Sequence, residues 1–399
     1  MNLLKRMFCR TFQAGFRLAM PLLPYTNPEV LDYVAEVPTL LKKLGVKSVL
    51  FVTDKQLRQF GVTAELEKLL EEAQIQTVMY DETCPNPTIA NVEAARKLYI
   101  EGNCTAIIAF GGGSSMDCAK AVGARITYPN RHVNQMKGLM KILKKIPTLI
   151  AIPTTAGTGS EVTITSVITD HEKKHKYTMN SFPLIPAYAV LDPSVTLTLP
   201  PSLTATTGMD ALTHAVEAYI GSYTTKETSA LAREAVKLVF ENLETAYNNG
   251  KDEVARRNML RASNIAGIAF SKACVGYIHA VAHTLGGQYN VPHGLANAVL
   301  MPIVLDEFGE SAHKKLHELA VVAGLSKEGD DVAESAKRFV QAIRDMNARM
   351  GIPTGFTNIV EADIPMLAKY ADAEGNPLYP VPKLMDREEL EKIYRKAML

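Results

Sequence analysis

Residues 105–123, TAIIAFGGGSSMDCAKAVG, decide the fold class of this chain. The first six are mostly apolar and include β-branched residues, a composition typical of a buried strand. Three glycines follow directly, and the residues after them have the spacing of a helix. Because a strand that passes through glycines into a helix is one half of a parallel strand–helix–strand unit, the stretch predicts an α/β domain.

The same alternation extends to both sides, from about residue 36 to residue 192. Strand patterns that we expect to be buried occupy residues 46–54, 76–82, 105–113 and 147–155. Amphipathic helical patterns lie between them, at 63–74 and 86–102. This order predicts a largely parallel, Rossmann-like sheet flanked by helices.

The character of the sequence changes near residue 200. Residues 203–399 are rich in Ala, Leu and Glu, with apolar positions at helical spacing and few strand candidates. A chain of 399 residues also exceeds the size of a single core. We therefore expect a basic amphipathic extension at 1–30, an α/β domain at 31–200, and an all-α domain at 201–399.

The glycine turn is a candidate phosphate site. Gly112 and Gly113 let a ligand approach the backbone closely, and the helix that follows offers free N–H groups to a pyrophosphate. Ser114 adds a hydroxyl donor. The turn is not GxGxxG, so a tight turn without a ligand is the alternative.

Asp54 ends the strand pattern VKSVLFVTD (46–54), where an acid can accept hydrogen bonds from a ribose hydroxyl. A 2′-phosphate there would meet a like charge, so Asp54 predicts a preference for NAD over NADP. The alternative is that Asp54 caps the helix that follows.

A second loop of small residues, TTAGTGSEVT (154–163), follows a strand and is either a second ligand loop or a plain polar turn.

Four residues of the second half predict a single-metal site. Asp210 and His214 lie four positions apart in the helical pattern GMDALTHAVEAY (208–219), so they share a helix face. His279 lies on a second apolar helix, and His293 follows Pro292 after a loop. One carboxylate and three imidazoles suit a first-row ion such as Fe(II) or Zn(II), whereas Ca²⁺ and Mg²⁺ prefer more oxygens.

Each of these histidines alone is more often a core or surface residue than a metal ligand. His313 and His317 in AHKKLHELA share the four-residue spacing but stand among charged residues. We interpret that pair as part of a solvated helix and not as a metal site.

Composition excludes some classes of function. Lys+Arg number 43 and Asp+Glu 42, without a long basic run, so nucleic acid is not an expected partner. Five scattered cysteines without CxxC spacing indicate free thiols in a reducing, cytoplasmic compartment. No apolar run reaches the roughly 20 residues of a transmembrane helix.

The N-terminal extension has its own pattern. Residues 1–28 contain four basic residues and no acid, while Leu4, Phe8, Phe12 and Phe16 recur at helical spacing. This pattern suits a transit peptide or a surface-binding amphipathic helix. We favour instead a helix docked on its own protein or on a second subunit, because the stripe is short and arginines interrupt it.

With GGGSSMDCAKA, IPTTAGTGSEVT, GMDALTHAVEAY, HAVAHTLGGQYNVPHG and NPLYPVPKLM in this order, the chain resembles the iron-containing (group III, metal-dependent) alcohol dehydrogenases. The resemblance spans roughly residues 36–385 and implies a dehydroquinate synthase-like architecture. In this architecture the α/β domain (31–200) would bind the dinucleotide, and the all-α domain (201–399) would be the metal-binding and catalytic domain. The family's short opening strand is not evident, since the basic extension stands in its place.

The resemblance also implies roles for individual residues. Asp210, His214, His279 and His293 would be the metal ligands, with His283 handling a proton. Gly112, Gly113 and Ser114 would contact the pyrophosphate of NAD(H). The other implied cofactor contacts are Thr154, Thr155, Ser160, Asn86 in CPNPT and Lys176 in KKHKY (173–177).

The implied function is that of an NAD(H)-dependent alcohol dehydrogenase or aldehyde reductase. Hydride would pass between a metal-bound primary alcohol and nicotinamide, with Fe(II) as the expected metal and Zn(II) as the alternative. We expect a homodimer or a larger homo-oligomer. Two other functions stay open: a metal- and NAD-using lyase of the dehydroquinate synthase type, whose expected basic residues are missing around the metal motifs, and a non-catalytic assembly subunit.

Overall fold

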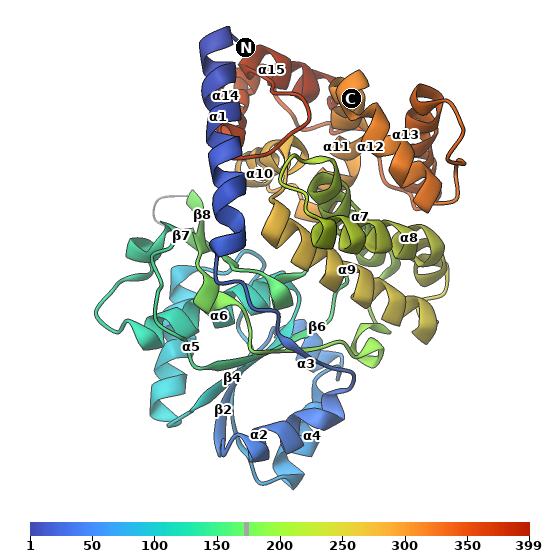
Figure 1. Cartoon of the computed structure of the whole chain (residues 1–399). Coiled ribbons are helices and arrows are strands. Elements are labelled where there is room, and N and C mark those ends of the chain that lie inside the picture. The colour runs from blue at the N-terminus through green and yellow to red at the C-terminus, as the bar shows by residue number, and fades with distance from the viewer. Residues whose placement is uncertain (171–174) are drawn as a thin grey trace. The chain divides into compact units, whose positions relative to one another are not determined.

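The sheet that the sequence predicts is present in the computed structural model, which describes residues 1–170 and 175–399 (Figure 1). The chain divides into two units. One is Pro24–Leu199, and the other combines Met1–Leu23 with Pro200–Leu399. Each unit carries one of the two sites considered below.

The unit Pro24–Leu199 contains a parallel sheet of six strands in the order β1-β9-β6-β4-β2-β3. In that order the strands are Glu29–Leu31, Tyr188–Val190, Thr148–Pro153, Ala106–Gly111, Ser48–Val52 and Gln76–Tyr80. The prediction of a parallel sheet is thereby confirmed.

Two of the strand expectations need correction. β3 is not fully buried, because it forms one edge of the sheet and its first four residues are exposed or half-buried. The opening strand does exist: β1 pairs with β9, more than 150 residues later in the chain. Its three residues are too few to show a pattern in the sequence.

Helices cover both faces of this sheet because its strand residues alternate in direction. Ile107 and Ala109 of β4 pack in one core with α5 and α6, whereas Ile108 and Phe110 pack in a second core with α2 and α4. The helices of this unit are α2 (Val37–Lys43), α3 (Lys55–Gln59), α4 (Ala64–Glu72), α5 (Ile89–Glu101) and α6 (Gly113–Thr127).

A second, small sheet in this unit is not evident in the sequence pattern. β7 (Thr165–Asp170) and β8 (His175–Asn180) form an antiparallel pair, and β5 (Gly138–Leu139) pairs with β8. The pair lies beside the loop before α5, since the Thr169 N–H donates to the Pro87 carbonyl at 2.8 Å.

The other unit is helical in all its named elements, which confirms the second part of the fold prediction. Its central helices α7 and α10 are largely apolar all round and correspondingly buried. The helices are α1 (Leu3–Ala19), α7 (Pro201–Ile220), α8 (Lys226–Asn248), α9 (Glu253–Ala273), α10 (Tyr277–Tyr289), α11 (His293–Phe308), α12 (Glu310–Val322), α13 (Val332–Arg349), α14 (Ile364–Gly375) and α15 (Arg387–Lys396).

Two observations on this unit bear on earlier expectations. The reading of α12 as a solvated helix is wrong for His317, which is buried while His313 is half-buried. Within the described residues, no single helix is long and apolar enough to cross a membrane, although α9 and α10, bent by 103°, pass that test of length and composition as a pair.

Candidate functional site

The carboxyl ends of β2, β4 and β6 lie side by side in the sheet. The residues after them are the ones that the sequence singled out: Asp54, the three glycines, and the loop that begins at Thr154. Ligands of open parallel sheets bind outside this edge. The topology thus brings three separately predicted segments to one edge.

The glycine turn leaves the start of α6 open. Gly111 has φ +152°, and a Cβ on it would lie 2.5 Å from the Ser115 hydroxyl, so only glycine fits. Gly112 is the N-cap residue of α6 and provides no side-chain cap. The first N–H groups of α6 are therefore available to an anion.

The loop after β6 lies against this turn. The Thr154 N–H donates to the Gly111 carbonyl at 3.1 Å. A Cβ on Gly112 would lie 3.5 Å from the Thr155 hydroxyl, which is ordinary contact, and one on Gly113 would lie 3.0 Å from the Thr158 methyl. The predicted residues Thr154 and Thr155 thus line the same small region as Gly112 and Gly113.

Ser160 belongs to a buried network within the protein. Its hydroxyl accepts from the Lys120 Nζ at 3.0 Å and lies 3.2 Å from an Asp117 carboxylate oxygen. Lys120 also donates to Thr163 and Thr165. Burial lowers the pKa of Lys120 to about 8 and raises that of Asp117 to about 6. Sequence reasoning missed this pair, although both residues follow the glycines on α6.

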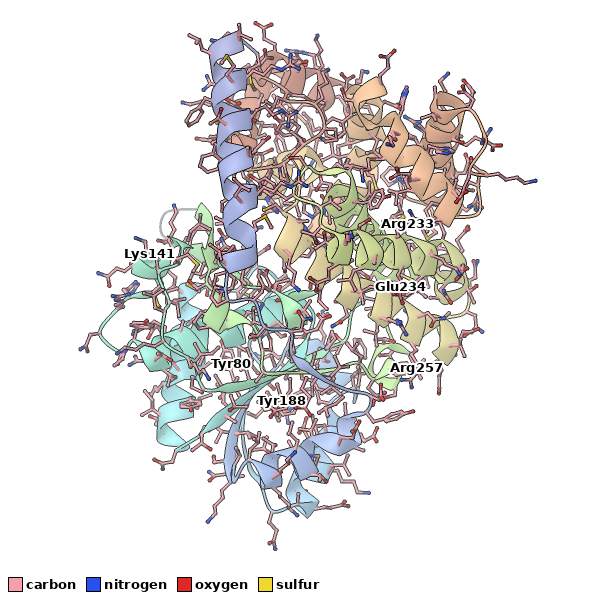
Figure 2. All side chains as sticks on the ribbon, in the orientation of Figure 1. Tyr80, Lys141, Tyr188, Arg233, Glu234 and Arg257 are labelled. Atoms are coloured by element: carbon pink, nitrogen blue, oxygen red, sulfur yellow. The ribbon has the colours of Figure 1, made fainter. Side chains whose placement is uncertain are left out.

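Asn86 lies beside the same turn, and Lys176 is connected to the loop of Asn86 through its partner strand β7. Asn86 has φ +60°, and its N–H donates to the Ser114 hydroxyl at 3.3 Å. The loop is held by Asn91, whose amide donates to the hydroxyl of Tyr80 (labelled in Figure 2) at 2.9 Å. Lys176 pairs in register with Thr169, and Thr169 bonds to this loop. Burial lowers the pKa of Lys176. Lys173 and Lys174 of the KKHKY motif lie outside the described residues.

Asp54 caps helix α3, which was the alternative to its predicted contact with a ribose hydroxyl. Its Oδ1 accepts from the N–H groups of Gln56 and Leu57 at 2.9 and 3.0 Å, at the N-terminus of α3. Because both bonds use the same oxygen, capping does not by itself exclude a ligand contact at Oδ2.

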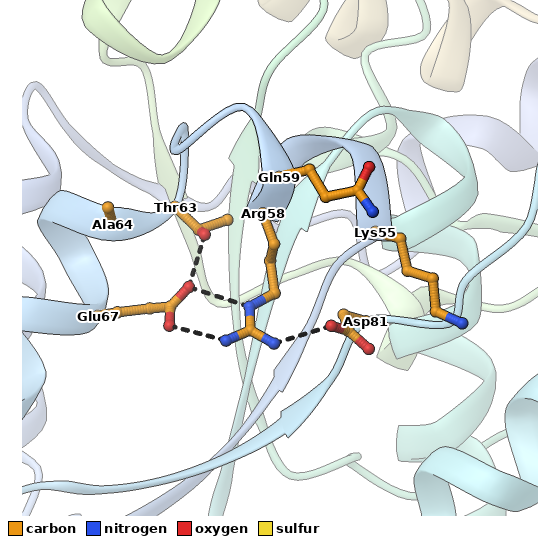
Figure 3. Close-up of a pocket in the computed structure, with 7 residues that line it drawn as sticks. All are labelled: Lys55, Arg58, Gln59, Thr63, Ala64, Glu67 and Asp81. Carbon is orange, nitrogen blue, oxygen red and sulfur yellow. Dashed lines mark hydrogen bonds and ion pairs between the residues drawn. The ribbon is translucent and has the colours of Figure 1, made fainter.

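A surface pocket of about 470 Å³ lies beside α3 (Figure 3). Its wall includes Arg58, which donates to Asp81 at 2.8 Å and pairs with Glu67 at 3.4 Å. Two carboxylates thus neutralise this guanidinium. The pocket does not present an uncompensated arginine to a phosphate group.

The four predicted metal ligands come together in the helical unit. Asp210 and His214 come from α7, His279 from α10, and His293 from the first residue of α11. One ligand atom from each lies within 4.8 Å of all the others. Gly294 permits this approach, because a Cβ there would lie 2.4 Å from a backbone carbonyl of α7. The first three side chains are buried, and His293 is partly exposed.

Glu217 orients one of these ligands. It lies on α7, and its Oε2 is 2.6 Å from the Nδ1 of His279, while its Oε1 accepts from the Ile278 N–H. Burial lowers the pKa of His279, which keeps the ring neutral, and raises that of Glu217 to about 8. A divalent cation nearby would favour the ionised form of Glu217, and a carboxylate that accepts from Nδ1–H leaves Nε2 to bind the metal.

Asn297 lies one helical turn after His293 on α11. Its Nδ2 is 2.7 Å from Asp210 Oδ1 and 3.1 Å from the Nε2 of His279. Its Oδ1 is buried without a hydrogen-bond partner among the described residues. Turning the amide would present this acceptor to a cation held by the four ligands, so the donor set and the orphaned oxygen both fit a divalent metal.

His283 lies beside the cluster but is not one of its four members. Its ring centroid is 5.3 Å from that of His293, and its Nδ1 is 2.6 Å from the Glu374 carboxylate on α14. Desolvation lowers the pKa of His283 and Glu374 raises it, with a net direction above 6.5. Tyr379 donates to Glu374 at 2.8 Å and so holds the pair in place.

Glu217, Asn297 and Glu374 were all missed by the sequence reasoning. Two of them had a local signal, since Glu217 is three residues after His214 and Asn297 is four after His293. Glu374 had none, because it is about 90 residues from His283.

Comparison with known proteins agrees with this geometry. Residues 31–193 match the family described as iron-containing alcohol dehydrogenase, and residues 204–398 match the C-terminal part of the Fe-containing alcohol dehydrogenase family. Together the two matches span most of the chain and leave the first 30 residues outside.

Individual relatives cover nearly the same region. Alcohol dehydrogenase 4 of Saccharomyces cerevisiae is 38% identical over 366 residues, which are 91% of this chain and 94% of the yeast protein. NAD-dependent methanol dehydrogenase of Bacillus methanolicus is 37% identical over 85% of this chain and 89% of its own length. A crystal structure of 1,3-propanediol oxidoreductase superposes with a TM-score of 0.90 at 36% identity and covers 94% of this chain and 99% of its own. The resemblance is confirmed: this chain belongs to the iron-containing alcohol dehydrogenase family and is an oxidoreductase that acts on alcohols.

Proposed function

We propose that this protein is an NAD(H)-dependent alcohol dehydrogenase and aldehyde reductase whose substrates are small primary alcohols and aldehydes. The observation that carries the proposal is the cluster of Asp210, His214, His279 and His293, with one ligand atom from each residue within 4.8 Å of the rest. A non-catalytic subunit would not need to keep four such residues in this arrangement.

The four residues would hold one divalent metal, with Fe(II) as the first candidate and Zn(II) as the second. When bound, the ion supplies Lewis acidity toward the oxygen of the alcohol or aldehyde. Glu217 keeps the tautomer of His279 that leaves Nε2 to the metal. The Asn297 amide adds an acceptor once it turns.

His283 would handle the proton of the reaction. Its Nδ1 is bonded to Glu374, so its Nε2 is the nitrogen left to exchange a proton with the substrate or with a bridging water. Glu374 stabilises the charged imidazolium, which makes His283 a proton donor during aldehyde reduction and an acceptor during alcohol oxidation.

The other unit would bind the dinucleotide along its carboxyl edge. The N–H groups at Gly112, Gly113 and Ser114 suit the pyrophosphate. Thr154 and Thr155 adjoin that turn, as do Asn86 and Lys176 through the loop before α5. Ser160 would contribute by holding its loop against Lys120 and not through a free hydroxyl.

Asp54 would select NAD. Its Oδ2 can accept a ribose hydroxyl, whereas a 2′-phosphate would meet its charge and an Arg58 already paired with two carboxylates. Asp54→Asn keeps an N-cap acceptor but removes the charge. For this variant we expect the kcat/KM for NADH, divided by that for NADPH, to be about tenfold lower than in the parent. A ratio that does not move removes Asp54 from the site.

We further propose a reducing, cytoplasmic setting and a homo-oligomeric state, a dimer or larger. All five cysteines are free, which supports the first point. Sedimentation of the purified protein tests the second.

The function is tested by removing the metal and restoring it. Chelated protein should lose NADH oxidation across a panel of small aldehydes, and Fe(II) or Zn(II) should restore it at one ion per chain. Full activity in protein that metal analysis shows to be free of metal would refute the proposal. Turnover of a phosphate-bearing substrate without net NADH consumption would favour the lyase instead.

A further inference from the structure

Helix α1 lies along the helical unit and docks through a polar face (Figure 1). Lys5 pairs with Asp372 on α14 at 2.7 Å, and Arg10 donates to the carbonyls of Val381 and Pro382 at 2.9 and 2.8 Å. Gln13 is buried and donates to the Tyr379 carbonyl at 2.7 Å. With Cys9 also buried, this inner face holds the helix in place.

The outer face of α1 is apolar and exposed. Leu4 is 79% exposed, Phe8 60% and Leu18 80%, and Leu3, Met7 and Phe12 are exposed as well. These residues fall on one arc of the helix, opposite Cys9 and Gln13. We expected this helix to dock on its own protein or on a second subunit. In the structure its polar side bonds to the helical unit, and most of the apolar stripe is left to solvent.

The charges on α1 itself have one sign, and Asp386 and Asp372 of the helical unit pair with its N-terminus and Lys5. Arg6 and Arg17 are exposed and lie beyond one edge of the apolar arc, and the first 28 residues contain no acid. A second copy of the chain would bring the same basic flank to the contact, without acids of α1 to compensate it. A surface that is apolar and negatively charged complements this face.

Helix α1 also lies outside the residues that match the family. The family match begins at residue 31, and the crystal structure of 1,3-propanediol oxidoreductase covers 94% of this chain and 99% of its own. The exposed face is therefore not needed to build the shared fold or its site.

We propose that the outer face of α1 binds the surface of a membrane that contains anionic lipids. Leu4, Phe8 and Leu18 enter the interface between headgroups and acyl chains, and Arg6 and Arg17 contact the lipid phosphates. The helix lies in the plane of the membrane, since its inner face stays bonded to the helical unit.

The test uses the full chain and vesicles that sediment in the centrifuge. Binding to vesicles of phosphatidylcholine with phosphatidylserine should exceed binding to phosphatidylcholine alone, and added salt should weaken it. Leu4→Ser with Phe8→Ser should lower the partition coefficient by about tenfold or more. Arg6→Gln with Arg17→Gln should lower it on the anionic vesicles only.

Matched controls distinguish binding through this face from non-specific binding of the protein to vesicles. Val254→Ser changes an apolar residue on α9 that is 70% exposed, and Lys42→Gln with Lys43→Gln removes two exposed charges on α2. Both should bind vesicles like the parent, and every variant should keep its NADH-dependent activity. Equal losses in the controls would overturn the proposal. A parent protein that binds no vesicles would also overturn the proposal. If that protein formed dimers and Leu4→Ser with Phe8→Ser abolished them, the face would be assigned to a second copy of the chain.

Discussion

The two candidate sites are built in opposite ways. The metal cluster uses side chains from three helices, α7, α10 and α11, and its three most buried ligands are almost completely enclosed. The carboxyl edge of the sheet uses backbone groups and small side chains that follow strands. The metal cluster depends on four ligand atoms that no neighbouring group can replace, whereas the edge of the sheet offers many separate contacts to a ligand.

This difference predicts different responses to substitution. Removing one metal ligand removes a share of the coordination that nothing nearby can replace. Removing one contact from the dinucleotide edge leaves the other contacts in place. Substitutions in the two sites, taken from the largest expected effect to the smallest, test this difference.

His279→Ala should have the largest effect. It removes a buried ligand, so the metal should be lost and kcat/KM should fall by roughly a thousandfold or more. The fold should be largely retained, although Glu217 loses its partner at a cost of about 1–3 kcal/mol of unfolding free energy. Metal analysis and circular dichroism check both parts.

His283→Ala should keep the metal and reduce kcat by about 10²- to 10⁴-fold. If both histidine variants lost metal equally, the division of roles between them would be wrong.

In the parent, aldehyde reduction should fall as pH rises through the pKa of His283, which lies above 6.5, because only the protonated ring donates. Glu374→Gln should move that fall to lower pH, since the carboxylate raises this pKa.

Glu217→Gln should weaken metal affinity by about 10- to 100-fold, because the amide is a poorer acceptor for the Nδ1–H of His279. The matched control is Glu227→Gln, an exposed carboxylate on α8 that pairs with Lys272. A competition assay with a chelator measures both variants. The orienting role fails if the two variants hold metal alike.

Gly112→Ala should have the smallest effect. Its φ is −78°, and the new Cβ would meet only Thr155 at 3.5 Å, so the unfolding free energy should change by less than about 1 kcal/mol. The methyl group would still occupy space that the pyrophosphate needs, so the KM for NADH should rise about tenfold. Gly329→Ala, in open space, should change neither quantity. An unchanged KM in Gly112→Ala would place the pyrophosphate elsewhere.

The sequence by itself determined which residues share a local face. The spacing of Asp210 and His214 placed both on one side of a helix, and glycines after an apolar strand predicted the turn at the start of α6. These are properties of helix and strand periods, which extend over a few residues and need no distant contact. The shared face of Asp210 and His214 and the parallel sheet were predictable for that reason.

Only the tertiary structure decided which faces meet. β1 pairs with β9 across more than 150 residues, Glu374 reaches His283 from another helix, and Ser160 turns inward to Lys120. The period of α1 marked an apolar stripe, but hydrogen bonds from Arg10 and Gln13 to a distant segment leave most of that stripe in solvent. Such choices depend on contacts between segments far apart in the chain, and local periodicity does not encode them.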